Sequence, residues 1–537
     1  MNVQEEILTE KKRDNIFLFR SMTLVMLATL LSRLLGFFRE VSIAYRFGTT
    51  METDAYLVAI LLPTILFYAF SDALRNTFIT VFAAFRKDES APRFLNTLTL
   101  YISAALLLFV LLGLLFAPQV VFLLAPGFRG EAFNLTVKLT RILLPGIFFM
   151  GLAGIATGFL HSHQRFLIPA LVNVPHNLIV IGSALFLGAG YGITGLAAGS
   201  LVAVASQFFI QVPSLCRVPF PFSPGLSPGH PGLKKISALL PAILLSSAVL
   251  ELKHLLDRLF ASFLPAGNIS SLNYAERIYV LPQAILGTGI IIVLYPVLVE
   301  MLNEKDLQSF VREVSRGISL LLFALLPVTA GLMMLRIPLV EVFFERGAFD
   351  ASATEMTARA LFYYTPGLVG FALHYFCNRI FFALQEVKVL VWVNLAMVGA
   401  NALFNFLLMP GLGHGGIALG TSLAFTLGSL WLFFVFARRL SLSFRRLLLA
   451  PLFRSGLATA FMAAGLYFFS YFWTGFLGRP FTGMTLLLTA VLWGAAVYFL
   501  SAYLLRLPEM ALLQEFLRGV AGKGPSSEGR SGAQPQR

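Results

Sequence analysis

Long uninterrupted runs of apolar residues constrain this chain more than any other feature of its sequence. Typical runs extend from Phe94 to Phe116, from Ile318 to Leu335 and from Leu486 to Leu505. A helix needs about 20 mostly apolar residues to cross the hydrocarbon core of a membrane, and each run is long enough. The apolar residues follow one another instead of alternating with polar ones, which excludes membrane-spanning strands. The runs therefore predict transmembrane helices.

The low share of charged residues leads to the same conclusion. Of the 537 residues, 58% are hydrophobic and only 12% are charged. A soluble protein carries charge on about a quarter of its residues, because water must solvate its surface. Here lipid must cover most of that surface. The sequence predicts an all-α integral membrane protein.

Polar residues, prolines and glycines divide the chain into fourteen predicted spans. These are residues 17–47, 53–85, 94–117, 134–160, 166–188, 192–214, 236–264, 270–302, 313–345, 354–384, 387–410, 414–437, 448–476 and 482–506.

Basic residues gather in alternate loops between these spans. One set of loops contains, among others, Lys11, Lys12, Arg86, Lys234 and Arg438, whereas the loops TTME, GAGYG, PAGN and GLGH contain no Lys or Arg. The positive-inside rule then places both termini in the cytoplasm, which requires an even number of spans. The net charge of +14 fits this orientation and contact with acidic lipid headgroups, so we expect membrane lipids and no nucleic acid as partners.

An internal repeat relates the two halves of the chain. FLHSHQRFLIPALVN (159–173) aligns without a gap on IFFALQEVKVLVWVN (380–394), and TGLAAGS (194–200) aligns on GGIALGT (415–421), both at an offset of 221. The segment from Asp54 to Pro63 aligns on that from Asn273 to Pro282 at an offset of 219. Each repeat holds six spans, so both copies enter the membrane in the same direction. The pattern predicts two parallel six-helix lobes with a cavity between them.

This organisation divides the chain into six parts. We predict a cytoplasmic N-terminal segment (1–16), an N-lobe (17–216), a cytoplasmic linker (217–235), a C-lobe (236–440), two additional spans (441–506) and a disordered cytoplasmic tail (507–537).

Ionisable residues lie at membrane depth on four spans that occupy equivalent places in the repeats. They are Arg33, Arg39, Glu40 and Arg46 on the first span, Asp54, Asp72 and Arg75 on the second, Glu251, Lys253, His254, Asp257 and Arg258 on the seventh, and Glu276 and Arg277 on the eighth. Such residues normally face a bundle interior or water. Because a guanidinium matches two phosphate oxygens, the arginines predict a polyanion site. The alternative is pairing with nearby acids, as for Lys253 and Asp257, which stand at positions i and i+4.

A second group of polar residues belongs to the second repeat alone. Asn401 and Asn405 share a face of the eleventh span, Thr421 lies on the twelfth and Asp257 on the seventh. Carboxylate, amide and hydroxyl oxygens are ligands for a hard cation. Hydrogen bonds between helices are the other interpretation, because Asn and Thr commonly form them in membranes.

Several segments resemble the MurJ (MviN) family over nearly the whole chain. They are LSRLLGFFREVSIAYRFGTTMETDAYLVAILLP (31–63), HQRFLIPALVNVPHNLIVI (163–181), YAERI (274–278), ERGAFD (345–350) and LGHGGIALGTSLA (412–424). The resemblance implies a lipid II flippase of the multidrug/oligosaccharidyl-lipid/polysaccharide (MOP) exporter superfamily, located in the bacterial inner membrane. The substrate implied is a polyprenyl-pyrophosphate-linked glycan, moved from the inner to the outer leaflet.

The resemblance also assigns roles to residues. Arg33, Arg39, Asp54 and Arg277 match essential charged positions of a central cavity, and residues 441–506 match a pair of helices that holds the lipid tail. Asp257, Asn401, Asn405 and Thr421 match a sodium site, and no other cofactor is implied. Where the family has an essential arginine, this chain has Phe67. Arg75 and Arg258 complete the set of expected substrate contacts.

Two other functions remain open at this stage. The chain could flip a different polyprenyl-linked glycan, or it could be a drug or cation antiporter of the same superfamily. An antiporter for organic cations should have cavity acids without an arginine cluster. A transferase would need a DxD or His-Asp arrangement on a loop, and the sequence contains none, so we expect a transporter and not an enzyme.

Overall fold

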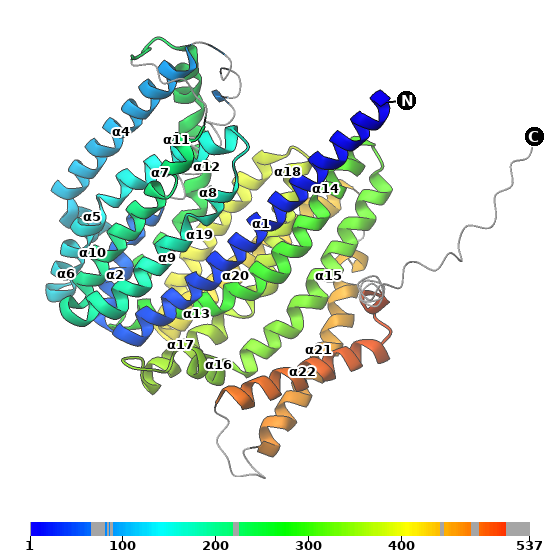
Figure 1. Ribbon diagram of the computed structural model, residues 1–537. Coiled ribbons are helices and arrows are strands. Elements are labelled where there is room, and N and C mark those ends of the chain that lie inside the picture. Colours follow the sequence, from blue (N-terminus) through cyan, green and yellow to red (C-terminus); the bar gives the residue numbers. More distant parts are fainter. Residues whose placement is uncertain are drawn as a thin grey trace, which may run out of the picture. The chain divides into compact units, whose positions relative to one another are not determined.

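The computed structural model describes residues 2–65, 81–82, 85, 88, 90–218, 225–440, 445–473 and 483–511. Over these residues the chain is helical, and they contain no strand (Figure 1). The prediction of an all-α fold is confirmed. The first helix runs without interruption through Gly36, so it is not unwound there.

The helices follow one another closely along the chain. In the first half they are α1 (Asn2–Phe47), α2 (Met51–Ala59), α4 (Ala91–Leu115), α5 (Ala117–Leu124), α6 (Gly130–Leu143), α7 (Gly146–Ser162), α8 (Leu167–Leu171), α9 (Asn173–Gly182), the π-helical turn η1 (Ser183–Leu187), α10 (Gly188–Phe209), α11 (Val212–Cys216) and α12 (Pro231–Ala261). In the second half they are α13 (Asn268–Pro282), η2 (Gln283–Gly287), α14 (Thr288–Asn303), α15 (Leu307–Met334), α16 (Arg336–Phe344), α17 (Ala351–Tyr364), α18 (Gly367–Ala383), α19 (Val387–Leu412), α20 (His414–Arg439), η3 (Arg445–Leu449), α21 (Ala450–Tyr471) and α22 (Met484–Leu504).

Many of these helices are suited to a membrane. Within the described ranges, nine helical segments are long and apolar enough to cross one. One of the nine, Leu167–Cys216, is 50 residues long and therefore holds two crossings of about 20 residues each. It corresponds to the predicted spans 166–188 and 192–214. The total of fourteen spans stays a prediction.

The helices form two compact units. The first unit comprises Met1–Arg277, Phe343–Ala360 and Asn394–Ala424, and the second comprises Ile278–Val342, Leu361–Val393 and Phe425–Arg537. These units differ from the predicted lobes, because the first unit contains residues of both repeats. The division into lobes stays a prediction.

In the first unit, three segments far apart in the sequence meet at the turn that follows α1. The fully buried Tyr274 donates its hydroxyl to the carbonyl of Gly48 at 3.2 Å, and its ring lies 5.6 Å from that of Phe349. The amide of Ala348 donates to the carbonyl of Tyr45 at 2.8 Å. The segments FGTT, YAERI and ERGAFD are therefore joined by direct contacts.

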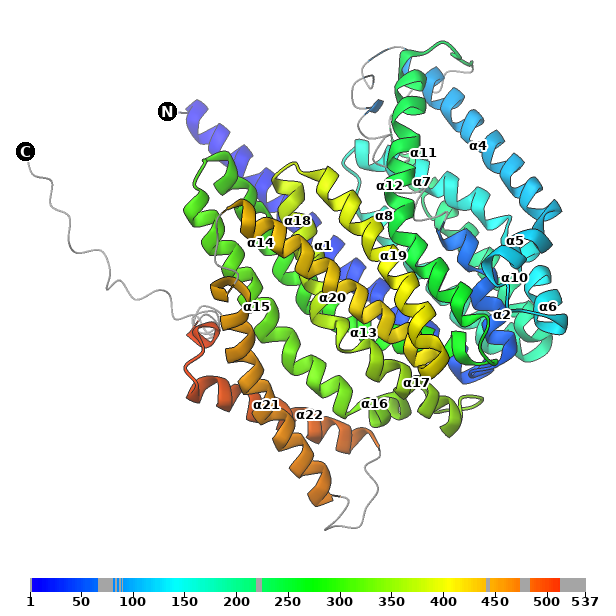
Figure 2. The same ribbon diagram turned by 180° about the vertical axis from the view of Figure 1, so that it is seen from behind.

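In the second unit, α21 and α22 pack against α15, as Figures 1 and 2 show. Buried Met462 and Leu466 of α21 and Leu487 of α22 contribute to one apolar cluster. Tyr498 of α22 donates its hydroxyl to the carbonyl of Phe323 at 2.7 Å. A buried hydroxyl with a backbone partner fixes the register of α22 along α15, since leaving it without one would be costly.

The backbone forms the same turn at equivalent positions of the two repeats. Gln164 and Gln385 both have positive φ, at 58° and 60°. The amide of Arg165 donates to the carbonyl of Leu160 at 2.9 Å, and that of Glu386 donates to Phe381 at 2.9 Å. Both are the long hydrogen bond of a left-handed helix cap. The backbone geometry is independent of the sequence alignment, so this agreement supports the internal repeat.

Candidate functional site

Glu40 is the centre of a charged network in the first unit. Its side chain is almost completely buried, with a relative exposure of 3% for the residue. Oε1 accepts from Nη2 of Arg39 at 2.6 Å and lies 3.4 Å from Nε of Arg277. Oε2 accepts from the amide of Asn273 at 3.0 Å. Asn273 and Arg277 stand at positions i and i+4 of α13 and therefore share a face of that helix.

A third arginine joins this network through Asn273. Arg258 of α12 donates to the side-chain oxygen of Asn273 at 3.0 Å and to the carbonyl of Ile269 at 2.7 Å. Arg39 also binds an asparagine, since its Nη1 donates to the side chain of Asn177 at 3.2 Å. Arg39 and Arg258 align in the predicted repeat at an offset of 219.

The network holds more guanidinium groups than carboxylates in direct contact. Arg39 and Arg277 both contact Glu40, and Arg258 joins through Asn273. The carboxylates of Glu276 and Asp54 also interact electrostatically with arginines of this group. The side chain of Arg39 is 23% exposed and that of Arg277 is 47% exposed. Arg277 reaches Glu40 through Nε, so its terminal nitrogens can meet a second anion. An Arg–phosphate contact of this kind is commonly bidentate.

Arg33 lies on α1, before Arg39, and its side chain is exposed. The two arginines are six residues apart, which corresponds to about 9 Å of helix, so their side chains lie at different heights along α1. The structure therefore brings Arg39 and Arg277 to the Glu40 carboxylate, links Arg258 to it through Asn273, and leaves Arg33 on a separate part of the helix.

Asp54 caps the first turn of α13 from the neighbouring α2. It is 2% exposed, and its two carboxylate oxygens accept the backbone N–H groups of Gly267 and Ser270, both at 2.7 Å. An anion at a helix N-terminus satisfies amides that have no partner in the helix itself. The geometry makes Asp54 a positioning residue for α13, the helix that carries Arg277. Substrate contact by Asp54 stays a prediction.

The four polar residues of the second repeat come together within hydrogen-bonding distance. The amide of Asn405 donates to Oδ1 of Asp257 at 2.8 Å, and the hydroxyl of Thr421 donates to Oδ2 at 3.2 Å. Asn401 donates to the hydroxyl of Thr421 at 3.2 Å. The group connects α12, α19 and α20, and Figure 2 shows α12 and α19 side by side. Hydrogen bonding between helices, one of the two interpretations of this group, is thus confirmed.

As arranged, these residues do not fit a sodium ion. The amide nitrogen of Asn405, and not its oxygen, faces the carboxylate of Asp257. The ammonium of Lys253 already lies 3.3 Å from Oδ2 of Asp257. A hard cation needs several oxygen atoms directed toward one point. The Asp257 carboxylate is instead held by two hydrogen bonds and an ion pair.

The expected site residue Arg75 lies outside the described residues, as does Phe67, which stands where the family has an arginine. Sequence reasoning also left out of the site four residues that the structure places in it: Glu40, Asn177, Asn273 and Lys253. Asn273 gave a signal, since it occupies the place of Asp54 in the repeat. Glu40 gave another, because it is an acid at membrane depth directly after Arg39. The sequence did not indicate that Glu40 and Asn273 contact each other, because they lie on helices far apart in the chain.

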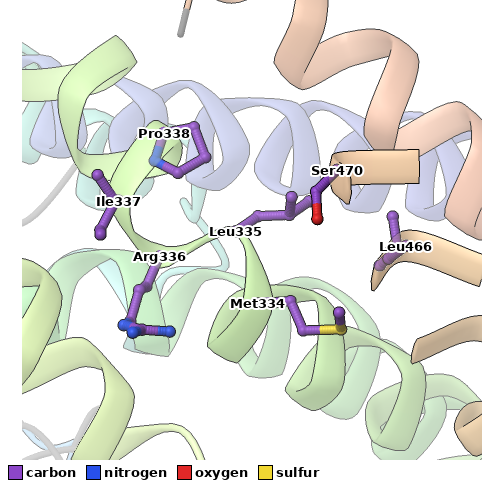
Figure 3. A pocket seen from close by; sticks show the side chains of 7 residues that line it. All are labelled: Met334, Leu335, Arg336, Ile337, Pro338, Leu466 and Ser470. Carbon is purple, nitrogen blue, oxygen red and sulfur yellow. The ribbon is translucent and has the colours of Figure 1, made fainter. Parts of the chain in front are cut away.

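The second unit contains a pocket of about 290 Å³ beside α21. Its lining is mostly apolar and consists of Met334, Leu335, Arg336, Ile337, Pro338, Leu466 and Ser470 (Figure 3). In Figure 3 Leu335 points toward Ser470. The guanidinium of Arg336 lies over the ring of Phe362, 4.9 Å from its centroid. The pocket thus offers an apolar surface with one cation at its edge.

Comparison with known proteins relates most of the chain to a single family. Residues 43–487 match the family model described as lipid II flippase MurJ. A Burkholderia cenocepacia protein named lipid II flippase MurJ is 30% identical over 501 residues, covering 90% of this chain and 96% of that protein. A Thermotoga maritima protein named probable lipid II flippase MurJ is 28% identical over 498 residues, covering 92% and 97%.

Solved structures agree with these relatives. A structure of lipid II flippase MurJ in an inward closed conformation matches with a TM-score of 0.78 and 26% identity, covering 90% of this chain and 98% of that one. An inward-facing multidrug resistance transporter of the MATE family, in the MOP superfamily, matches with a TM-score of 0.66 and 17% identity, covering 76% and 94%. The second likeness shows the fold alone.

Proposed function

The chain belongs to the MurJ family of lipid II flippases, and from this premise we propose that it carries lipid II across the bacterial inner membrane. The substrate is the peptidoglycan precursor linked to undecaprenyl pyrophosphate, and it moves from the inner to the outer leaflet. The chain is a multi-pass membrane transporter, and we propose that both of its termini are cytoplasmic, in keeping with the distribution of basic loops.

The observation that carries this proposal is the arginine network around Glu40. Two guanidinium groups on one carboxylate, with Arg258 linked to it through Asn273, favour an anion with several charged oxygens, and pyrophosphate is the charged part of the proposed substrate. Arg39 lies on α1 and Arg277 on α13, and both contact the Glu40 carboxylate. A phosphate that took the place of this carboxylate would therefore be bound by arginines of two helices. A guanidinium keeps its charge at any physiological pH, so the charge of the arginines that bind the phosphate does not depend on proton concentration.

Glu40 gives the site a way to release its substrate. When the pyrophosphate leaves, the carboxylate reclaims Arg39 and Arg277 and restores the contacts seen here. Without such a competing anion, the partly buried guanidinium of Arg39 would lose its charged partner, which is costly. Competition from Glu40 thus keeps the affinity for the pyrophosphate moderate. A transporter needs moderate affinity because it must release its substrate.

Contacts between α2 and α13 support alternating access as the mechanism. Asp54 belongs to the first repeat and the amides of Gly267 and Ser270 belong to the second. In the proposed orientation these residues lie toward the outer face of the membrane. Breaking these two hydrogen bonds would separate the repeats there and open the site outward. The inside-negative potential would assist the outward movement of an anionic headgroup.

The lipid tail is proposed to stay in contact with α21 and α22. These helices lie outside the predicted internal repeat, and the mostly apolar pocket beside α21 offers a surface that suits a polyprenyl chain. Leaving the tail in lipid avoids moving its long apolar chain through a polar cavity.

A flippase for another polyprenyl-linked glycan is the second candidate, and Phe67 is the reason to keep it. Loss of an expected arginine changes the contacts available to the headgroup but not the grip on pyrophosphate. An organic-cation antiporter fits the network poorly, because the half-exposed guanidinium of Arg277 would repel such a substrate.

Two experiments test the proposed function. Expression of the chain in cells depleted of their own lipid II flippase should restore growth, whereas failure despite normal membrane insertion would contradict it. Native mass spectrometry of the purified protein should reveal a bound lipid with the mass of lipid II. A co-purified lipid with a different glycan would instead favour the second candidate.

A further inference from the structure

Lys253 contacts Asp257, one of the four residues to which the resemblance to the family assigns a sodium ion. We infer that its ammonium group is a covalently attached substitute for that ion, so that the Asp257 group of this chain is held together without any metal. This inference does not depend on what the chain transports.

The position of Lys253 suits this role. The residue is only 7% exposed and lies at membrane depth on α12, one helical turn before Asp257. Its Nζ lies 3.3 Å from Oδ2 of Asp257 and 3.4 Å from Oε1 of Glu276 on α13. A buried ammonium requires opposite charge nearby, and two carboxylates provide it. One cation thus connects α12 with α13.

The neighbouring polar groups are arranged for a hydrogen-bonded carboxylate. Asp257 accepts from Asn405 and Thr421 in addition to its contact with Lys253. The oxygen of the Asn405 side chain is buried and has no hydrogen-bond partner within the described chain. Exchanging the nitrogen and oxygen of this amide by a flip would put two acceptor oxygens, those of Asn405 and Asp257, against each other. Only a cation between them would stabilise that arrangement.

Removal of the ammonium should therefore create a sodium site. The Asn405 oxygen, the Asp257 carboxylate and the Thr421 hydroxyl would then be available to one small cation, with Glu276 nearby. While Lys253 is present, its positive charge repels a second cation and its donors hold the carboxylate. Sodium dependence is thus expected to appear only when the lysine is replaced.

Thermal unfolding of the purified protein in sodium, potassium or choline chloride at equal ionic strength tests the inference. The wild type should have the same Tm in all three salts. Lys253→Met should have a lower Tm in potassium and choline, and saturating sodium should raise it by about 2 °C or more. Methionine keeps the apolar stem of lysine but not its charge.

Matched variants identify the source of the effect. Lys388→Met removes an exposed lysine and should show no sodium response. Lys253→Met combined with Asp257→Asn should lose the response, and Lys253→Arg should remain independent of sodium. A folded Lys253→Met without a sodium response would overturn the inference. If that variant does not fold, the Tm of the wild type is the remaining test. A saturable, sodium-specific rise of this Tm would overturn the inference. Identical Tm values in all three salts would support it.

Discussion

Nε of Arg277 lies 3.4 Å from Oε1 of Glu40, so an ion pair joins helix α13 to helix α1. The two residues are far apart in the sequence and belong to different repeats. The Glu40–Arg277 pair therefore belongs both to the proposed pyrophosphate site and to the contacts between the predicted repeats. In the proposed mechanism, transport breaks and restores such contacts.

Glu40→Gln should bind the substrate more tightly and deliver it more slowly. A neutral amide competes weakly for Arg39 and Arg277, so the pyrophosphate would remain bound to them. Retention of lipid in native mass spectrometry measures the first effect, and exposure of precursor at the cell surface measures the second. Glu52→Gln is the control, since Glu52 is an exposed acid on α2. Unchanged retention and delivery in Glu40→Gln would refute the competition between Glu40 and phosphate.

Asp54→Ala should destabilise the protein because the amides of Gly267 and Ser270 would lose their acceptor. A lost capping interaction costs about 1 kcal/mol, and here two amides are affected. Asp54→Asn keeps one acceptor oxygen and should have an intermediate effect. The Tm in detergent orders the three proteins. Equal Tm values for wild type and Asp54→Ala would show that the cap contributes nothing to stability.

Gln164→Gly and Gln385→Gly should each raise the Tm. Both glutamines have left-handed backbone geometry, which costs an L-residue about 1 kcal/mol relative to glycine. Substitution by alanine at the same positions retains the strain and should give no gain. Because the two turns are equivalent, the two gains should be similar. A gain at one position alone would indicate that the turns are not energetically equivalent.

Arg75→Ala should reduce transport more than Phe67→Leu does. Phe67 stands where the family has an arginine, and Arg75 is the nearby residue that can supply that charge from a different height on the predicted helix. Precursor delivery by each variant, corrected for its amount in the membrane, provides the comparison. The reverse order would remove the idea that Arg75 compensates for Phe67.

Local patterns predicted much of the fold. Apolar runs in the sequence identified the helices, because a membrane leaves the backbone few alternatives to a helix. The Lys253–Asp257 contact was also predictable, since residues at positions i and i+4 of a helix face the same side. The repeat equivalence of Arg39 and Arg258 stays a prediction, although each of these arginines binds an asparagine.

The partners of the site residues were harder to predict. Glu40 receives Arg277 from a helix in the other repeat, and the amides that bind Asp54 are similarly distant in sequence. Such contacts depend on how helices pack, which a single sequence does not encode locally. For the same reason, the residue types around Asp257 left both a cation site and hydrogen bonding between helices open, whereas the structure shows which atoms face the carboxylate.

The central claim is that Arg39 and Arg277 together hold the pyrophosphate of the substrate. The most direct measurement is the amount of lipid-linked precursor that an added headgroup-cleaving enzyme can reach from outside, in depleted cells expressing Arg39→Ala or Arg277→Ala. We predict that both variants insert normally and deliver almost no precursor, and that Arg→Lys at either position restores only part of the delivery, because lysine lacks the bidentate fork. Full delivery by both alanine variants would contradict the account.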